Sequence, residues 1–298
     1  MTLSHLPATR PAQSETTQRV HWGLANFAYF TMLPTAPITS KSNARVKALR
    51  ASFGGNASQP GDLLGIEGEH LIAEALRSGC TLESLFLREG SEAILTRPSL
   101  SSLDARTLFI LSRDVFASAV ETASPQGIAA TLRISVPQTT EPAPRSTALV
   151  LEALQDPGNL GTLIRSAEAF GTLEIFLTPD TVNQWNPKVV RSSAGSVFRV
   201  SITRAPLPQI ATQLAQQGTT LYAAVAQPAD STSLLDTHFA PNSAILIGNE
   251  GAGLTESALT LAHHRIRIPC AVESLNAAIA GSTLLYEVMR QQSLIPNP

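Results

Sequence analysis

Hydrophobic residues in the second half of the chain occur in short runs that alternate with longer, helix-periodic segments. The runs predicted to be strands are 148–153, 174–177, 197–202, 221–226, 244–247 and 265–268. Strands that are apolar at nearly every position are typical of a parallel sheet with helices on both faces. We therefore expect an α/β domain with a mostly parallel sheet over residues 148–298.

The segment near the C-terminus shows the clearest helical pattern of the chain. Positions at steps of three and four predict one buried face, made of Leu275, Ala278, Ile279, Ser282, Leu285, Tyr286 and Met289. Ser274 stands just before this pattern, and serine is a favourable N-cap because its hydroxyl accepts a backbone N–H. We expect Ser274 to begin the helix.

The first half predicts a smaller α/β domain over residues 40–135. A helix-periodic run at 70–76 ends near Gly79, and strand-like segments follow at 85–87, 108–111 and 127–134. Three prolines interrupt all periodicity in residues 136–147, which is typical of a linker. Residues 1–39 are rich in Pro, Thr, Gln and Ser and predict a flexible leader.

Overall charge gives no general signature of a polyanion-binding protein, because the formal net charge is −2. The basic cluster is local, since Lys41, Arg45, Lys47 and Arg50 lie within a stretch that contains no acid. Such a run fits either a solvated helix face or a patch that contacts phosphates. The residues alone leave both interpretations open.

Cysteine and histidine usage points away from disulfides and metals. Cys80 and Cys270 form no disulfide framework, which suits the reducing cytoplasm. His263 and His264 are adjacent, but no histidines stand at metal-ligand spacing, so no metal is expected. The apolar stretch 22–33 is short for a membrane span and lacks a signal-peptide cleavage pattern, so we expect a soluble, cytoplasmic protein without a membrane partner.

Ligands of an open parallel sheet bind beyond the carboxyl ends of its strands, so the loops at these ends are the candidate site. The first loop and its helix read DPGNLGTLIRSAEAFG, residues 156–171, and its glycines permit close backbone approach. Arg165 and Glu168 are three residues apart on this helix and therefore neighbours on one face. A surface ion pair between them is the simplest structural interpretation.

The second loop, residues 248–254, reads GNEGAGL. Its backbone N–H groups could cradle a ligand, but the glycine order differs from the dinucleotide-binding fingerprint, and a structural turn is equally compatible. The third loop, residues 268–281, reads IPCAVESLNAAIAG and by itself indicates a capped helix. No single loop identifies a ligand.

Together and in this order, the loops resemble the SpoU/TrmH-type RNA 2′-O-ribose methyltransferases of the SPOUT superfamily. The segments that carry the resemblance are PGNLGTLIRSAEAFG, ILIGNEGAGL and IPCAVESLNAAIAGSTLLYE, within a match over residues 40–291. NPKVVRSSAGSVFRV, residues 186–200, also resembles the family, and GIEGEHLIAEALRSG and SPQGIAA are similar to its substrate-binding domain. The chain departs from the family pattern at Cys270, Ala271 and Ala277, where we expect only backbone contacts to the cofactor.

The resemblance implies a C-terminal domain with a trefoil knot, a smaller N-terminal domain that binds substrate, and an obligate homodimer with a shared active site. It implies S-adenosylmethionine as the methyl donor and structured RNA as the partner, with ribosomal RNA favoured over transfer RNA. The implied catalytic residues are Arg165, Asn159, Glu250, Ser274 and Asn276. The implied cofactor-binding residues are Gly248, Ile268, Leu275, Asn249 and Gly253, and the implied RNA-binding residues are Lys188, Arg191, Ser193, Lys41 and Arg45.

The resemblance assigns the catalytic arginine to Arg165, and its chemistry limits the role. A guanidinium is too weak an acid to give up its proton in a protein. We therefore expect Arg165 to grip an RNA phosphate and to stabilise the developing oxyanion, not to act as a base.

Two other classes of protein stay open. A non-catalytic RNA-binding protein that retains the fold would not bind S-adenosylmethionine, and the intact Arg165, Asn159 and Glu250 argue against it. A nucleotide-dependent oxidoreductase on an ordinary doubly wound sheet would be protected from unfolding by NAD. The order of the glycines in residues 248–254 argues against that class.

Overall fold

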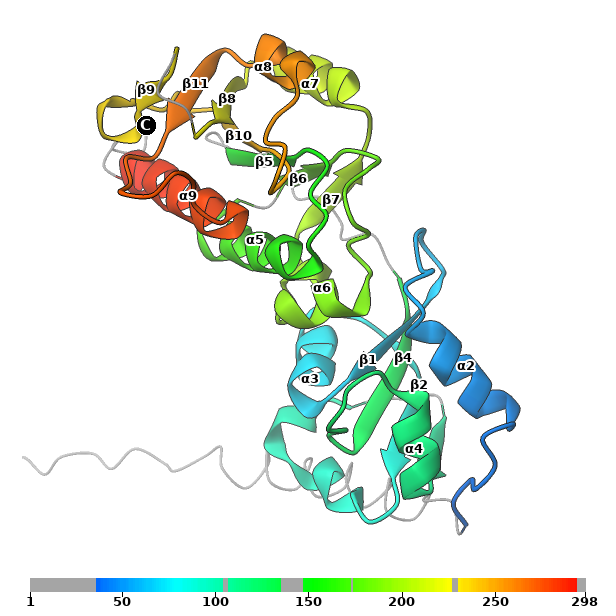
Figure 1. Ribbon diagram of the computed structural model, residues 1–298. Coiled ribbons are helices and arrows are strands. Elements are labelled where there is room, and N and C mark those ends of the chain that lie inside the picture. The colour runs from blue at the N-terminus through cyan, green and yellow to red at the C-terminus, as the bar shows by residue number, and fades with distance from the viewer. Residues whose placement is uncertain (1–35, 104–106, 135–146, 173, 227–229, 294–298) are drawn as a thin grey trace, which may run out of the picture.

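The computed structural model describes residues 36–103, 107–134, 147–172, 174–226 and 230–293. These residues form two α/β domains, one above the other in Figure 1. The predicted linker and most of the predicted leader lie outside the described residues, so both stay predictions. Ile38 belongs to the folded part, because it forms a parallel bridge with Leu111, and the N-terminal domain thus begins before residue 40.

The N-terminal domain is a four-stranded sheet with helices on both faces. Its strands are β1 (Leu63–Glu67), β2 (Leu82–Arg88), β3 (Leu108–Leu111) and β4 (Ile128–Arg133), in the order β1-β4-β2-β3. Its helices are α2 (Ala44–Ser52), α3 (Glu69–Arg77) and α4 (Arg113–Ala119), with short 3-10 turns at Glu92–Thr96 and Pro98–Leu100. Strand β4 runs antiparallel to both β1 and β2, which makes it the centre of the sheet.

The C-terminal domain is built on a seven-stranded sheet in the order β7-β6-β5-β10-β8-β11-β9. These strands are β5 (Thr147–Leu151), β6 (Glu174–Leu177), β7 (Ser201–Arg204), β8 (Thr220–Ala224), β9 (Thr232–Ser233), β10 (Ser243–Ile247) and β11 (His264–Arg267). Each described pairing is parallel. Every residue of the central β10 is buried, as expected for a strand covered on both sides.

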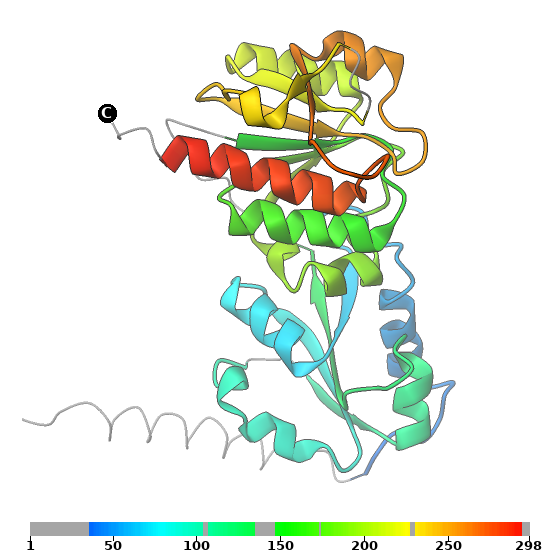
Figure 2. The same cartoon turned by 60° about the vertical axis from the view of Figure 1, so that its left-hand side comes forward.

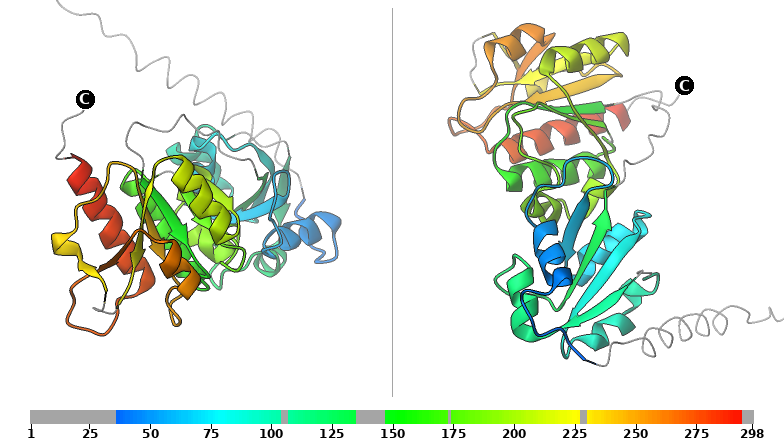
Figure 3. Two further views of the ribbon diagram at one scale, coloured as in Figure 1. Left: turned by 90° about the horizontal axis from the view of Figure 1, so that it is seen from above. Right: turned by 90° about the vertical axis from the view of Figure 1, so that its right-hand side faces the viewer.

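Helices cover both faces of this sheet. The helices are α5 (Pro157–Ala169), α6 (Pro187–Ser192), α7 (Leu207–Gln216), α8 (Glu256–Leu261) and α9 (Ala277–Ser293), with 3-10 turns η3 (Ser196–Phe198) and η4 (Leu234–Asp236). Helices α5 and α9 lie on the face towards the N-terminal domain, and α7 and α8 lie on the far face (Figures 2 and 3). The predicted α/β architecture with a mostly parallel sheet is confirmed. The trefoil knot stays a prediction.

Helix α5 packs very closely against α6 and α9. A Cβ atom on Gly161 would lie 2.6 Å from the Val189 carbonyl oxygen of α6. A Cβ atom on Gly281 of α9 would overlap the side chain of Leu163 on α5. Glycine at both contacts lets α5 sit between its two neighbours, and this placement fixes the helix that carries Asn159 and Arg165.

The predicted strand at 197–202 is wrong over its first half. Gly195 has a φ of 92°, and the chain then forms η3 before β7 begins at Ser201. Strands β1 and β9 and helix α4 were not predicted. The other predicted strands of the C-terminal domain match the observed ones within two residues at each end.

The predicted cap and buried face of the last helix are also wrong in part. Asn276, not Ser274, caps α9, because its Oδ1 accepts the backbone N–H groups of Ala278 at 2.9 Å and Ile279 at 3.2 Å. The buried residues of α9 are Ala278, Gly281, Leu284, Leu285 and Val288. Ile279 and Tyr286 are 57% and 49% exposed, because the face that contains Gly281 packs most closely on α5. The predicted stripe contacts α5 only in part, through the Ser282 hydroxyl at Ser166 and the Tyr286 ring at Phe170.

Candidate active site

Strands β5 and β10 are parallel neighbours, and this register brings the first two candidate loops together. Leu151 and Ile247 are paired at the ends of the two strands, so the chain leaves both strands at the same place. Strand β8 separates β10 from β11, whose loop approaches from the other side. The three loops chosen from the sequence therefore lie at one edge of the sheet.

The Glu250 carboxylate connects the first and second loops. It accepts the Asn159 side-chain amide at 3.0 Å, the backbone N–H of Asp156 at 3.1 Å and that of Gln155 at 3.3 Å. Asn276 then donates from Nδ2 to the Asn159 Oδ1 at 3.0 Å. The hydrogen-bonded series Asn276–Asn159–Glu250 thus joins all three loops.

These bonds shift the acidity of Glu250. Partial burial acts to raise its pKa, but hydrogen bonds from Asn159 and from the backbone of Asp156 and Gln155 outweigh burial and lower the pKa below its ordinary value of 4.5. Glu250 is therefore ionised at neutral pH and accepts these bonds as an anion.

Asn249 holds the glycine loop in shape. Its Nδ2 donates to the Ala153 carbonyl at 2.8 Å, and its Oδ1 accepts the backbone N–H groups of Gly251 and Ala252 at 2.9 Å and 3.0 Å. Its backbone exchanges two hydrogen bonds of 3.0 Å with Gly253. A side chain at Gly248 would collide with the returning backbone, since its Cβ would lie 2.5 Å from the Gly253 carbonyl.

A buried carboxylate that the sequence analysis did not single out supports the same loop. Glu152, at the end of β5, is 6% exposed and accepts the Thr255 hydroxyl at 2.7 Å and its backbone N–H at 3.1 Å. Thr255 in turn caps α8, because its Oγ1 accepts the Ala258 N–H at 3.1 Å. A buried charge needs such partners, so the acid directly after an apolar strand was the available signal.

A cavity of about 710 Å³ opens beyond the ends of β8, β10 and β11, and it is lined by the second and third loops together with residues that follow β8. Asn159 and the rest of the first loop do not line it. All five predicted cofactor-binding residues line it, namely Gly248, Asn249, Gly253, Ile268 and Leu275. Glu250, Ser274 and Asn276 of the predicted catalytic set line it as well. The sequence analysis did not identify Ala224, Arg265 or Glu273, which also contribute to the wall.

Arg165 does not belong to this wall. Its side chain is exposed on α5 and forms no hydrogen bond or ion pair with any of the described residues. The interpretation of Arg165 and Glu168 as an ion pair is wrong, because the Glu168 carboxylate binds Arg199 instead. The guanidinium of Arg165 is therefore available to a ligand outside its own fold.

The predicted RNA-binding residues lie in different settings. Lys188 and Arg191 are exposed on α6 and form loose ion pairs, with Asp156 at 3.6 Å and with Glu121 at 3.7 Å. Lys41 and Arg45 are exposed at the start of α2, and the Arg45 guanidinium lies 5.5 Å from the ring centroid of Phe109.

The prediction that Ser193 contacts RNA conflicts with the structure. Ser193 is fully buried, and its hydroxyl donates to the Val190 carbonyl at 2.9 Å. This hydroxyl therefore helps to end α6 and does not reach the surface.

Within the described ranges, no three His, Cys, Asp or Glu side chains are grouped so that they could hold a metal ion. The same part of the chain contains no helix that is long and apolar enough to cross a membrane.

Two family models match the chain and follow its two domains. The model of the RNA 2′-O ribose methyltransferase substrate-binding domain matches residues 66–137, and that of the SpoU rRNA methylase family matches residues 146–286. The chain belongs to the SpoU rRNA methylase family. The second match contains all three candidate loops and the described residues that line the cavity.

Individual proteins of this family match the chain over most of its length. An uncharacterised tRNA/rRNA methyltransferase of Synechocystis is 37% identical over 88% of this chain and 97% of its own length. A 23S rRNA guanosine 2′-O-methyltransferase of Bacillus subtilis is 32% identical over 75% of this chain and 87% of its own. The crystal structure of an AdoMet-bound rRNA methyltransferase from Sinorhizobium meliloti is 26% identical, covers 88% of this chain and 99% of its own, and superposes with a TM-score of 0.72.

We predict that Glu250→Gln loosens the joined loops in a pH-dependent manner. The folded pKa of Glu250 is depressed, so its contribution to stability is complete at neutral pH and is lost as the pH falls from the ordinary value of 4.5 through the lower, folded value. Thermal unfolding should show a lower melting temperature for the variant at neutral pH, with the difference shrinking at acid pH. Glu256→Gln, an exposed carboxylate on α8, is the control. A difference that stayed constant with pH would contradict the role of the charge.

Proposed function

We propose that this protein transfers the methyl group of S-adenosylmethionine to a ribose 2′-hydroxyl of structured RNA, with ribosomal RNA favoured over transfer RNA. The observation that carries the proposal is the cavity lined by the second and third family loops, to which the Asn276–Asn159–Glu250 series joins the first loop. Relatives named as 23S rRNA 2′-O-methyltransferases support the choice of RNA.

The residues of the cavity fit S-adenosylmethionine. Ile268 and Leu275 offer apolar surface for an adenine ring, and the backbone of Gly248 offers hydrogen-bonding groups close to it. Glu273 and Asn276 supply polar groups for the amino acid part of the molecule. When bound, the cofactor supplies an electrophilic methyl group on a sulfonium, and the protein has to position the attacking oxygen.

The chain's own residues favour charge stabilisation and positioning. The Arg165 guanidinium is unpaired among the described residues, so it can hold an RNA phosphate and stabilise the 2′-oxygen as charge develops. Asn159, Glu250 and Asn276 keep the three loops in register. Ser274 stands exposed at the rim of the cavity, where its hydroxyl can contact the bound RNA.

Binding of RNA is assigned to cations on both domains. Lys188 and Arg191 lie on α6, next to the catalytic helix α5, and Lys41 and Arg45 lie at the start of α2 (Figure 1). The ion pairs of Lys188 and Arg191 are exposed and long, so a phosphate can displace their carboxylate partners at little cost in free energy.

The active protein is proposed to be a homodimer in the cytoplasm. Ile279 and Tyr286 are seven residues apart on α9 and share its exposed side, and Val272 just before the helix is 61% exposed. Large apolar side chains grouped on a surface mark an interaction site. Because Arg165 is exposed and does not line the cavity of its own chain, it is suited to complete the cavity of a second copy.

The direct test combines two measurements on the whole protein. Calorimetry should show binding of S-adenosylmethionine. Nucleoside mass spectrometry should find a 2′-O-methyl nucleoside in RNA that has been incubated with the protein and S-adenosylmethionine. Absence of heat would favour the alternative of a non-catalytic RNA-binding protein. Absence of a methylated nucleoside despite cofactor binding would overturn the assigned reaction.

Arg165→Lys should lower the rate of methyl transfer by about 10²-fold or more, because a lysine cannot place two donors on a phosphate and an oxyanion at once. Cofactor binding, measured by calorimetry, should change little, since Arg165 does not line the cavity of its own chain. Near-native turnover of the variant would rule out a bidentate role for the guanidinium.

Lys188→Gln should weaken RNA binding in a salt-dependent manner. Each lost phosphate contact reduces the slope of log affinity against log salt concentration by about one. Arg133→Gln removes an equally exposed cation on β4 and serves as the control. Equal slopes of log affinity against log salt concentration for the wild type and both variants would show that Lys188 does not contact RNA.

The double variant Ile279→Glu and Tyr286→Glu should dissociate the dimer, because it buries like charges where the apolar stripe meets its copy. Sedimentation velocity should show a monomer that is still folded, and methyl transfer should be lost with the dimer. Gln216→Glu on α7, across the sheet, should leave both properties intact. A folded monomeric wild type would show that α9 has another role.

A further inference from the structure

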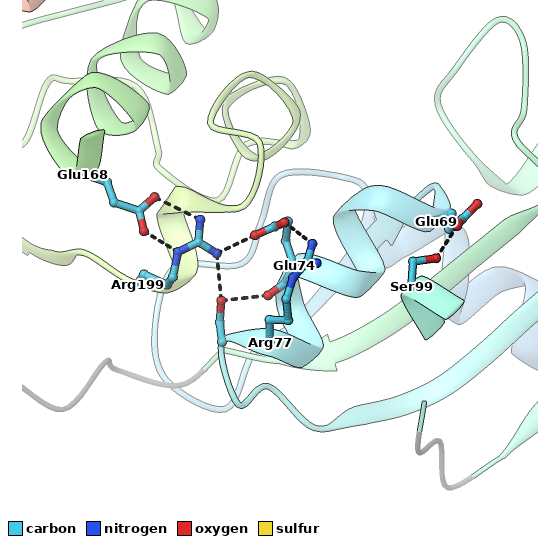
Figure 4. A network of polar contacts seen from close by, with 7 residues as sticks. Glu69, Glu74, Arg77, Ser99, Glu168 and Arg199 are labelled. Carbon is cyan, nitrogen blue, oxygen red and sulfur yellow. Dashed lines mark hydrogen bonds and ion pairs between the residues drawn. The ribbon is translucent and has the colours of Figure 1, made fainter. Parts of the chain in front are cut away.

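Arg199, which directly follows η3, connects the two domains through its guanidinium (Figure 4). Its Nε and Nη2 donate to the two carboxylate oxygens of Glu168, the latter at 2.9 Å. Its Nη1 donates to Glu74 at 2.8 Å and to the Ser78 hydroxyl at 3.1 Å. The bidentate arm stays within the C-terminal domain, and the other arm crosses to the N-terminal domain.

Each partner of Arg199 stands on an element with a role in the proposed reaction. Glu168 lies on α5, less than one turn after Arg165. Glu74 lies on α3, within the part of the chain that matches the substrate-binding model. The guanidinium thus bridges the catalytic helix and the substrate-binding domain.

The bridge is partly shielded from water, which strengthens it relative to the other ion pairs across the molecule. The side chains of Arg199, Glu168 and Glu74 are 32%, 25% and 16% exposed. The hydrogen bonds from Arg199 lower the pKa of Glu168 in spite of its partial burial. A planar fork with two parallel bonds is the strong form of an ion pair, and lysine cannot reproduce it.

Close packing around the bridge leaves little freedom between the domains. A Cβ atom on Gly195 would lie 2.5 Å from the Glu74 Cβ, so the two backbones meet almost directly. Asn183 donates to the Ala57 carbonyl at 2.7 Å at a second point of the junction. Arg199 therefore acts at a contact where a small displacement would move one domain relative to the other.

We propose that Arg199 is a positioning residue that holds the substrate-binding domain at a fixed orientation to α5, so that RNA bound by the first domain reaches Arg165 in register. This proposal rests on the proposed function. The orientation is set by an ion pair with one arm in each domain. Arg199 itself does not contact the reacting atoms.

The test removes the Arg199–Glu74 contact across the junction and keeps the hydrogen bond from Arg199 to Ser78. Glu74→Met leaves Arg199 paired with Glu168, and it also removes the ion pair of Glu74 with Arg77 (Figure 4). The matched control Glu69→Met likewise removes a carboxylate of the same helix and its ion pair to an arginine, because Glu69 binds Arg97 and Ser99 inside the N-terminal domain. Glu74→Met should raise the KM for RNA about tenfold, a typical coupling between sites. Its kcat and its affinity for S-adenosylmethionine should stay within about twofold of the wild type.

Two more variants separate positioning from general stability. Arg199→Lys should also raise the KM for RNA, because lysine keeps the positive charge but lacks the planar set of donors that a guanidinium offers. Arg199→Met combined with Glu74→Met should raise the KM no further than Arg199→Met alone, as expected for residues that act through one contact. Additive effects would overturn the proposal, as would a loss of cofactor affinity in step with the KM.

Small-angle scattering of the free protein gives a readout that does not depend on activity. Glu74→Met should broaden the distribution of distances between the domains, whereas Glu69→Met should leave it unchanged. Identical scattering and identical KM values for both variants would overturn the role of Arg199. If the wild type transferred no methyl group, the proposed function would fail, and the scattering would still decide whether Arg199 fixes the domains.

Discussion

The close approach of α5 to its neighbours is the constraint on which the rest of the structure depends. Gly161 and Gly281 have no side chain where α5 meets α6 and α9, and any Cβ there would push the helices apart. Helix α5 carries Asn159 towards the cavity, Arg165 towards solvent and Glu168 towards the domain junction. A shift of this helix would therefore disturb the loops, the exposed cation Arg165 and the domain contact together.

The charged groups at the site are of two kinds: carboxylates that are hydrogen-bonded within the fold, and exposed cations with few or no bonds to it. Glu250 and Glu152 are saturated with hydrogen bonds inside the fold and give the glycine loop a fixed shape. The Arg165 side chain makes no hydrogen bond or ion pair with the described residues, and the Lys188 ammonium forms only a long ion pair, with Asp156. Such a division is expected where a rigid binding site faces a charged substrate, because the fixed groups carry the geometry and the free groups meet the phosphates.

Local patterns predicted much of the fold and most of the cavity, because buried parallel strands are continuous apolar runs and ligand loops follow them. Strand β1 was missed because Gly65 breaks its run, and β9 because two residues form no pattern. The partner of Glu168 was misassigned because Arg199 lies 31 residues away, beyond any helical spacing. The buried face of α9 was misplaced since two adjacent stripes share one period, and only the contact between Gly281 and Leu163 distinguishes them.

The edges of both sheets limit how copies of this protein can associate. Of the two edge strands of the larger sheet, β9 has only two residues and β7 only four. In the smaller sheet the bridge from Ile38 covers part of β3. Short or occupied edges discourage open-ended strand addition. The proposed dimer is therefore expected to use a helical face, and an isologous contact of that kind closes after one copy.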